Sequence, residues 1–249
     1  MTARDWDART YDRIAHPMAR WGEAVLDRLD LAGDERVLDA GCGSGRVTER
    51  LLERLSRGRV VALDASPRMI EEARQRLAGY GDRVEFLVAD LRAPIPIQTV
   101  DAVFSTATFH WIADHEALFR NLASVTRAGG QLVAQCGGAG NLARVQAILD
   151  DLDPDRRLLR PWHFATPEDT RAALEAAGFT DISAWLHDEP TDILPESMAE
   201  FLRTIILGST LEHLPPPERE PLVQAVAARL GDGRLDYVRL NIVARRSVT

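Results

Sequence analysis

The chain has 249 residues, of which 45% are hydrophobic and 27% charged, values that are ordinary for a globular protein with room for one α/β domain. The formal net charge of −8 argues against a polynucleotide partner, because a phosphate backbone would be repelled on average. The chain contains no lysine, which excludes Schiff-base chemistry and the lysine of a P-loop.

The two cysteines, Cys42 and Cys136, do not suggest a disulfide framework or a zinc site, and no metal is expected. The first residues, up to Trp6, are polar and lack the apolar core of a secretory signal. No apolar run approaches the length of a membrane span. We therefore expect a cytoplasmic protein with no membrane partner.

The first 136 residues alternate between helix and strand patterns. Two helices are expected within residues 5–31, interrupted near His16 and Pro17. Apolar strands follow at 36–39, 60–64, 84–88, 100–105 and 131–135, separated by amphipathic helices at 47–55, from Ser66 onward and at 118–125. This alternation predicts a parallel, doubly wound α/β sheet, whose ligands bind at the carboxyl ends of the strands.

The remaining residues are less regular. A helix is predicted at 167–177, a strand at 179–187, helical segments at 195–208 and 216–230, and a final strand at 236–244. We interpret the stretches 137–165 and 189–233 as helical insertions that form a cap over the ligand edge of the sheet. The whole chain, 1–249, is expected to be a single domain.

The most informative motif is the run Val-Leu-Asp-Ala-Gly-Cys-Gly-Ser-Gly at residues 37–45. An apolar strand containing Asp39 ends in three glycines, Gly41, Gly43 and Gly45, where a ligand can approach the backbone closely. The dinucleotide fingerprint would need a glycine in place of Arg46, and Asp39 would oppose a pyrophosphate. The motif therefore favours a ligand with cationic groups, such as S-adenosylmethionine.

Two more acids stand at strand ends. Asp64 follows the second strand and suits ribose hydroxyls, and Asp90 follows the third strand and suits an adenine amino group. Either acid could instead cap the helix that follows it. Three carboxylates at three successive strand ends match the methionine, ribose and adenine parts of S-adenosylmethionine.

Together these residues resemble the class I S-adenosylmethionine-dependent methyltransferases. The resemblance covers essentially the whole chain and is carried by residues 37–45, 61–70, 89–91, 101–105 and 109–111. It implies a Rossmann-like sheet of seven mostly parallel strands, of which the last, 236–244, is antiparallel. The cofactor-binding residues that follow from the motifs and the resemblance are Asp39, Gly41, Cys42, Gly43, Gly45, Asp64, Ala65, Met69, Ala89, Asp90, Leu91 and Tyr11.

Two of these assignments have a plain alternative. Cys42 could simply be a small residue fitted into the turn. Tyr11, like Trp6, could close over the cofactor or belong to an amphipathic face that packs on the sheet.

The second half of the chain resembles more narrowly the small-molecule methyltransferases of the trans-aconitate methyltransferase kind. The matching runs are Phe-His-Trp at 109–111, Ala-Ala-Gly-Phe at 176–179 and the ending at 239–246. The first run departs from that branch, because His110 stands where the branch carries a glutamine. The resemblance implies a small-molecule acceptor.

His110 is the candidate catalytic residue. It follows the fourth strand, where a general base would be needed for a hydroxyl or amine acceptor, whereas a carboxylate acceptor needs none. The alternative is that His110 packs under a lid. Trp111, Arg160 and His163 are candidate substrate residues; Arg160 could bind a carboxylate with both of its outer nitrogens or remain solvated.

The predicted function is methyl transfer from S-adenosylmethionine to a small molecule, with a carboxylate or hydroxyl oxygen as candidate acceptor, by a monomer or homodimer. An RNA or protein methyltransferase and a non-catalytic binding module are the alternatives. Against RNA stand the net charge and the run Ser-Thr-Ala-Thr at 105–108, where base-amino methyltransferases carry Asn/Asp-Pro-Pro-aromatic.

Overall fold

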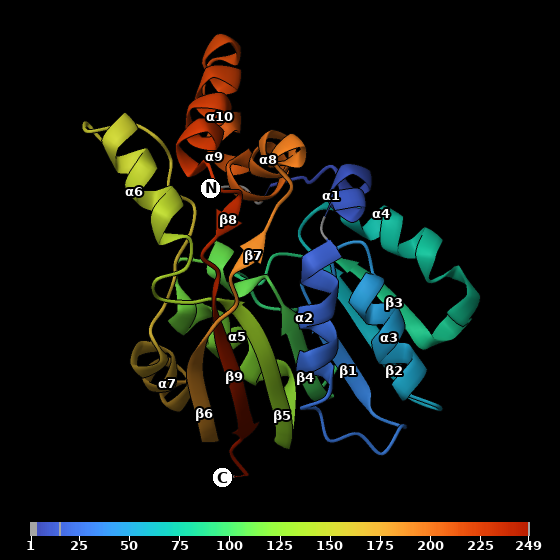
Figure 1. The fold of residues 1–249 in the computed structure, drawn as a ribbon. Helices are drawn as coiled ribbons and strands as arrows, with labels where there is room; N and C mark the ends of the chain where they lie inside the picture. The colour runs from blue at the N-terminus through green and yellow to red at the C-terminus, as the bar shows by residue number, and fades with distance from the viewer. Residues whose placement is uncertain (1–3, 15, 249) are drawn as a thin grey trace.

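The fold is built on a seven-stranded sheet (Figure 1). The computed structural model describes residues 4–14 and 16–248, with residues 9, 11 and 16–20 described by their backbone only. In sequence order the sheet strands are β1 (Arg36–Ala40), β2 (Arg59–Asp64), β3 (Val84–Val88), β4 (Val100–Thr106), β5 (Thr126–Gly137), β6 (Phe179–Asp188) and β9 (Val238–Arg246).

The strand order is β3-β2-β1-β4-β5-β9-β6. The first five strands pair in parallel, while β9 runs antiparallel to both β5 and β6. The predicted doubly wound sheet with an antiparallel last strand is therefore confirmed. Strand β5 begins five residues earlier than predicted, directly after the preceding helix, and its pairing with β4 shifts register near Val100.

Helices cover both faces of the sheet. One face carries α2 (His16–Leu26), α3 (Arg46–Arg54) and α4 (Pro67–Arg76), whose apolar side chains share a core with alternate residues of the strands. The other carries α5 (His115–Val125) and α7 (Pro167–Ala176) with the short turn η2 (Phe109–Trp111). Two further elements, α1 (Ala8–Ile14) and η1 (Ala78–Arg83), complete this part.

A helical layer lies beyond the carboxyl ends of the parallel strands, at the top of Figure 1. Its elements are α6 (Ala143–Leu152), α8 (Pro195–Phe201), the short π-helix η3 (Leu202–Ile206), α9 (Gly208–Glu212) and α10 (Pro216–Leu230), with the small ribbon β7 (Thr191–Asp192) and β8 (Arg234–Leu235). This layer has its own apolar core, in which Val145, Phe201 and Val226 are buried. The ribbon was not predicted from the sequence.

No helix in the described part of the chain is long and apolar enough to cross a membrane.

Candidate active site

A cavity of about 790 Å³ lies between the carboxyl ends of the strands and the helical layer. Its walls come from the glycine turn after β1, the ends of β2, β3 and β4, the N-terminal segment and both predicted insertions. The volume falls within the range of roughly 300–1,000 Å³ typical of ligand sites. The position is the one expected for ligands of a doubly wound sheet.

The glycine turn presents bare backbone to this cavity. Gly41 and Gly43 have φ values of 89° and 54° and both line the cavity. The turn is held by the Leu63 carbonyl, which accepts hydrogen bonds from the amides of Gly41 (2.8 Å) and Cys42 (2.9 Å). A Cβ on Gly41 would stand 2.1 Å from Thr108 Oγ1, whereas nothing lies within 4 Å of one on Gly43. A ligand can therefore approach this turn.

Asp64 is fixed at the cavity edge by backbone amides. Its Oδ2 accepts from the Gly43 amide (3.0 Å) and its Oδ1 from the Ser66 amide (2.8 Å). Burial raises the pKa of this carboxyl. Ser66 caps α4 by accepting from the amide of Met69, and Met69 is buried against the cavity. The carboxylate thus lies between the glycine turn and the start of α4, at the cavity that both of them line.

Asp90, with its neighbours Ala89 and Leu91, lines the same wall, as does Ala65. Arg92 donates to the Asp90 carboxylate through Nε (2.9 Å) and lowers the pKa of Asp90 by this hydrogen bonding. Asp90 is therefore ionised at neutral pH, and both of its oxygens accept hydrogen bonds from Arg92.

Three predicted cofactor residues lie behind this wall and do not line the cavity. Asp39 is 2% exposed and accepts from Thr48 Oγ1 at 2.7 Å. Cys42 packs into the core between the sheet and α3, and Gly45 begins α3, where a Cβ would meet Ala73 at 3.2 Å. For these three the structure favours support of the turn over direct contact. The side chain of Tyr11 lies outside the described residues.

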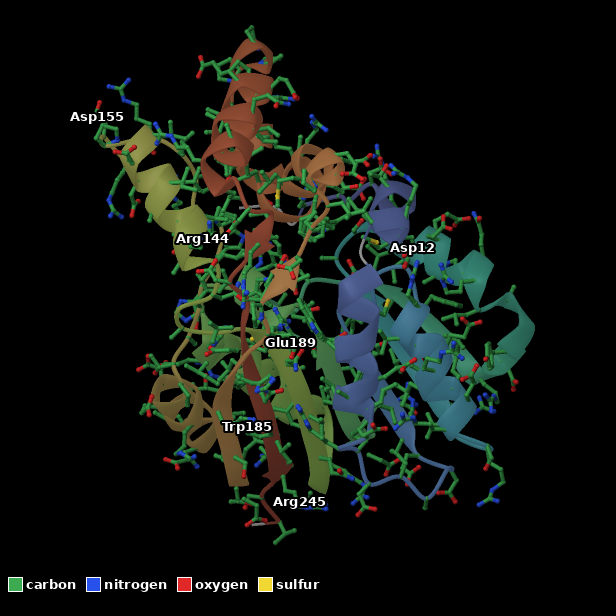
Figure 2. The ribbon with its side chains drawn as sticks, viewed as in Figure 1. Asp12, Arg144, Asp155, Trp185, Glu189 and Arg245 are labelled. Atoms are coloured by element: carbon green, nitrogen blue, oxygen red, sulfur yellow. The ribbon has the colours of Figure 1, made fainter. Side chains whose placement is uncertain are left out.

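The N-terminal segment crosses the cavity and joins its two walls. Arg4 forms an ion pair with Glu212 of α9 at 2.8 Å. Asp12, labelled in Figure 2, extends from α1 to Ser44 of the glycine turn and to Arg76 of α4. Between these anchors Trp6 packs edge-on against Trp111, with ring centres 5.3 Å apart, and both rings line the cavity.

His110 lies in η2 and is buried at the cavity floor. The Gly137 amide donates to its Nδ1 at 3.3 Å, so the neutral ring carries its proton on Nε2. Burial, helped by the charge of Arg239, lowers the pKa of His110 well below its ordinary value. At neutral pH the ring is therefore an Nε2–H donor.

Arg239 also lines this floor, and the sequence reasoning did not single it out. It is 3% exposed; its Nε donates to Gln135 Oε1 at 3.4 Å and its guanidinium stands 4.5 Å from the ring centre of Trp21. In the sequence it belongs to an amphipathic strand, so no local signal distinguished it.

The two remaining candidates differ. Arg160 lines the cavity, with its guanidinium 3.5 Å from the carboxylates of Asp150 and Asp153. His163 does not line the cavity: its ring packs edge-on against His115, with centres 4.6 Å apart. The predicted pocket contact of His163 is therefore not supported.

Known proteins match both the sequence and the fold. A family model described as "Methyltransferase domain" matches residues 37–130. Across 98% of its length the chain is 30% identical to a trans-aconitate 2-methyltransferase of Acidovorax sp. (strain JS42), covering 99% of that protein. It is 31% identical to an uncharacterised methyltransferase of Schizosaccharomyces pombe, over 97% of this chain and 98% of that one.

Among solved structures, a phosphoethanolamine N-methyltransferase 2 of Haemonchus contortus, determined with S-adenosylhomocysteine, superimposes with a TM-score of 0.65. The match covers 100% of this chain and 59% of that one at 18% identity, and it supports the fold.

The fold, the glycine turn and these matches define a methyltransferase that uses S-adenosylmethionine and a small-molecule acceptor. The chain belongs to the class I S-adenosylmethionine-dependent methyltransferases, in the branch of the trans-aconitate 2-methyltransferases. The residues fit this cofactor, because the glycine turn leaves open space at Gly43 and Asp64 offers a fixed acceptor beside it.

Replacing Asp64 by alanine is expected to weaken cofactor binding by about 2 kcal/mol, the usual value of a lost charge-assisted hydrogen bond. Calorimetric titration with S-adenosylhomocysteine measures this loss. Asp82→Ala, at an exposed acid on the opposite edge of the sheet, is the matched control. Equal affinities of Asp64→Ala and the wild type would contradict the assignment of Asp64 to the ribose.

Proposed function

We propose that the atom methylated is a carboxylate oxygen of a small organic acid, so that the product is a methyl ester. The observation that carries this proposal is the fixed tautomer of His110. Its Nδ1 accepts from the Gly137 amide, and within the described residues no hydrogen bond occupies Nε2. The ring at the floor of the cavity therefore donates a proton rather than accepting one.

A hydroxyl or amine acceptor would have to lose a proton, which requires a base within hydrogen-bond reach. A carboxylate is already ionised at neutral pH and needs no base. An Nε2–H donor and a guanidinium are suited to holding such an anion, and His110 and Arg239 both line the floor. The name of the Acidovorax relative, whose acceptor is a carboxylic acid, supports the same class.

S-adenosylmethionine supplies an activated methyl group when bound. The work of this chain is then to hold the acceptor anion in line and to keep water out. His110 and Arg239 hold the anion, and the packed rings of Trp6 and Trp111 exclude water. The glutamine that the branch carries at position 110 can donate in the same way, through its amide.

We propose further that residues 1–249 form one methyltransferase unit, with residues 137–165 and 189–233 as the cap. We also propose that it acts in the cytoplasm as a monomer or homodimer, without nucleic acid. The net charge of −8 and the five acidic side chains that line the cavity among the described residues support the last point.

Exchanging His110 for glutamine or for alanine tests the donor role. His110→Gln keeps an N–H donor and should retain kcat/KM within a few fold. His110→Ala should lose about 10- to 100-fold, which corresponds to one hydrogen bond to a charged group. The measurement is methyl ester formation from a carboxylic acid, with cofactor affinity determined in parallel.

Equal loss in both His110 variants would favour the general-base role and contradict the proposal. Methylation of alcohols or amines in place of acids would contradict it as well.

A further inference from the structure

A second fixed donor lies on the cavity floor, close to His110. Asn141 lines the cavity and is 2% exposed. It belongs to the turn between β5 and α6, where its backbone amide donates to the Gly138 carbonyl at 3.0 Å and its carbonyl accepts from Gln146 Nε2 at 2.8 Å. The backbone of Asn141 is therefore held on both sides.

The side-chain amide of Asn141 can take only one orientation. Its Oδ1 accepts from the backbone amide of Val238 at 2.9 Å. A flipped side chain would bring its NH2 group against the Val238 N–H, two donors facing each other, so this contact itself assigns the oxygen and the nitrogen. Within the described part of the chain no atom accepts from Nδ2. Asn141 therefore offers a donor to a ligand in the cavity.

Gly137 brings this donor close to that of His110. A Cβ on Gly137 would stand 2.9 Å from Asn141 Nδ2 and 2.8 Å from Phe164 Cε1. The amide of the same glycine donates to His110 Nδ1 at 3.3 Å, and the ring of Phe164 stacks on that of His110 with centres 6.0 Å apart. The two donors therefore lie around one residue at one corner of the cavity.

Backbone amides of two neighbouring strands orient both donors. Gly137 ends β5 and Val238 begins β9, and these strands lie side by side in the sheet (Figure 1). The Gly138 amide also donates to the Val238 carbonyl at 3.0 Å and ties the two strand ends together. The donors of His110 and Asn141 are thus in place before an acceptor binds, which saves the cost of ordering them.

Neutral donors suit the change of charge that accompanies ester formation. One carboxylate oxygen forms a bond to the methyl carbon as the carbon–sulfur bond breaks; the electron pair of that bond stays on sulfur, and no proton moves. The acceptor loses its negative charge, so a contact that depends on this charge weakens along the reaction. An N–H donor on the other oxygen keeps its hydrogen bond, because that oxygen becomes the carbonyl oxygen of the ester.

We propose that Asn141 Nδ2–H and His110 Nε2–H together bind the non-reacting oxygen of the acceptor carboxylate and leave its other oxygen free to react. This inference rests on the carboxylate transfer proposed above and adds Asn141 to the residues that bind the acceptor. An alcohol or amine has no second oxygen on its reacting group and would leave both donors without a partner, which is costly in a buried site. Asn141 thereby helps to select acids.

Replacing Asn141 by aspartate exchanges the donor for an acceptor with almost no change of shape. The Oδ1 contact with the Val238 amide is kept, so a purely structural role of Asn141 predicts little change. A binding role predicts that kcat/KM for an acid falls about 100-fold, because two anions would face each other, while affinity for S-adenosylhomocysteine stays within about twofold.

The assay uses the full chain with saturating S-adenosylmethionine and four acids: trans-aconitate, succinate, hexanoate and cinnamate. Methyl esters are quantified by mass spectrometry, and the acid that the wild type esterifies best is used for the variants. Gln98→Glu is the matched control, since it makes the same exchange at an exposed residue on the opposite edge of the sheet. It should retain the kcat/KM of the wild type.

Wild-type kcat/KM in Asn141→Asp would overturn this inference and leave the carboxylate proposal standing, and so would a loss explained entirely by weaker cofactor binding. Failure of the wild type to esterify any of the four acids, with cofactor binding intact, would overturn both.

A double-mutant cycle tests whether the two donors share one oxygen. In His110→Ala combined with Asn141→Ala, kcat/KM should fall by less than the product of the two single losses, because a carboxylate released by one donor gains less from the other. Cofactor affinity is measured in each variant to confirm that it is folded. Losses that multiply would show that the two side chains bind different groups and would contradict the proposal.

Discussion

Replacing Arg239 by glutamine is expected to lower kcat/KM for a carboxylic acid about 100-fold, while cofactor affinity stays unchanged. A hydrogen bond to a charged group contributes about 1.5–3 kcal/mol, and the upper part of this range applies where both partners are shielded from water. Arg239 is buried at the cavity floor beside His110 and away from Asp64 and Asp90, which face the cofactor.

Steady-state kinetics with the methylated acid, together with calorimetry of S-adenosylhomocysteine, separates the two effects. Arg239→Lys is the matched variant: it keeps the charge but loses the planar fork, so it should recover part of the activity. A fall in cofactor affinity that accounts for the whole loss would contradict the acceptor role.

Arg239→Gln has a second, independent consequence. The charge of Arg239 is one cause of the lowered pKa of His110, after burial. Its removal should therefore raise the pKa of His110, although burial still holds it below the ordinary value. An NMR titration of the imidazole measures this change, and an unchanged pKa would show that the charge of Arg239 does not act on His110.

The wall of the cavity that binds the cofactor could be predicted, because its residues lie close in sequence to the ends of strands. Parallel strands finish at one edge of the sheet, so Asp64 and Asp90 had to approach the same space as Gly41 and Gly43. The position of the Asp39 side chain was predicted less accurately. It lies inside β1 rather than at its end, and side-chain alternation turns it toward Thr48 of α3.

The cavity floor around His110 and Arg239 could not be predicted, because it depends on the pairing of strands that are far apart in the sequence. Arg239 reaches the cavity since β9 is antiparallel and begins where the other strands end, with Arg239 paired to Gly137. The side-chain direction of His163 could not be predicted either, although only its immediate neighbours are involved. Its neighbours Trp162 and Phe164 line the cavity, while His163 lies between them and packs on His115. A helical or extended pattern in the sequence identifies such residues as candidates but does not show which way their side chains point.

Replacing Asp39 by asparagine is expected to stabilise the protein more at pH 8 than at pH 5. Burial raises the pKa of Asp39 to about 7, from 3.8 for an exposed carboxyl. Between these values the folded state binds more protons than the unfolded state, so stability falls as pH rises through this window and the loss is complete above pH 7. A shift of this size corresponds to about 4 kcal/mol.

Asparagine removes this loss, because it stays neutral and still accepts from the Thr48 hydroxyl. Urea unfolding at pH 5 and pH 8 measures the difference, with Asp82→Asn as an exposed control. If the stability of Asp39→Asn changed with pH in the same way as that of the wild type, the pKa of Asp39 would not be raised by folding.

The same substitution should weaken cofactor binding at pH 8 and leave it unchanged at pH 5. At pH 8 the ionised Asp39 lies behind the glycine turn, where its charge attracts the positive groups of S-adenosylmethionine, whereas at pH 5 it is neutral like asparagine. Calorimetry at the two pH values tests this. A stabilised variant with weaker binding would mean that the chain retains a buried, destabilising acid because its charge serves the cofactor.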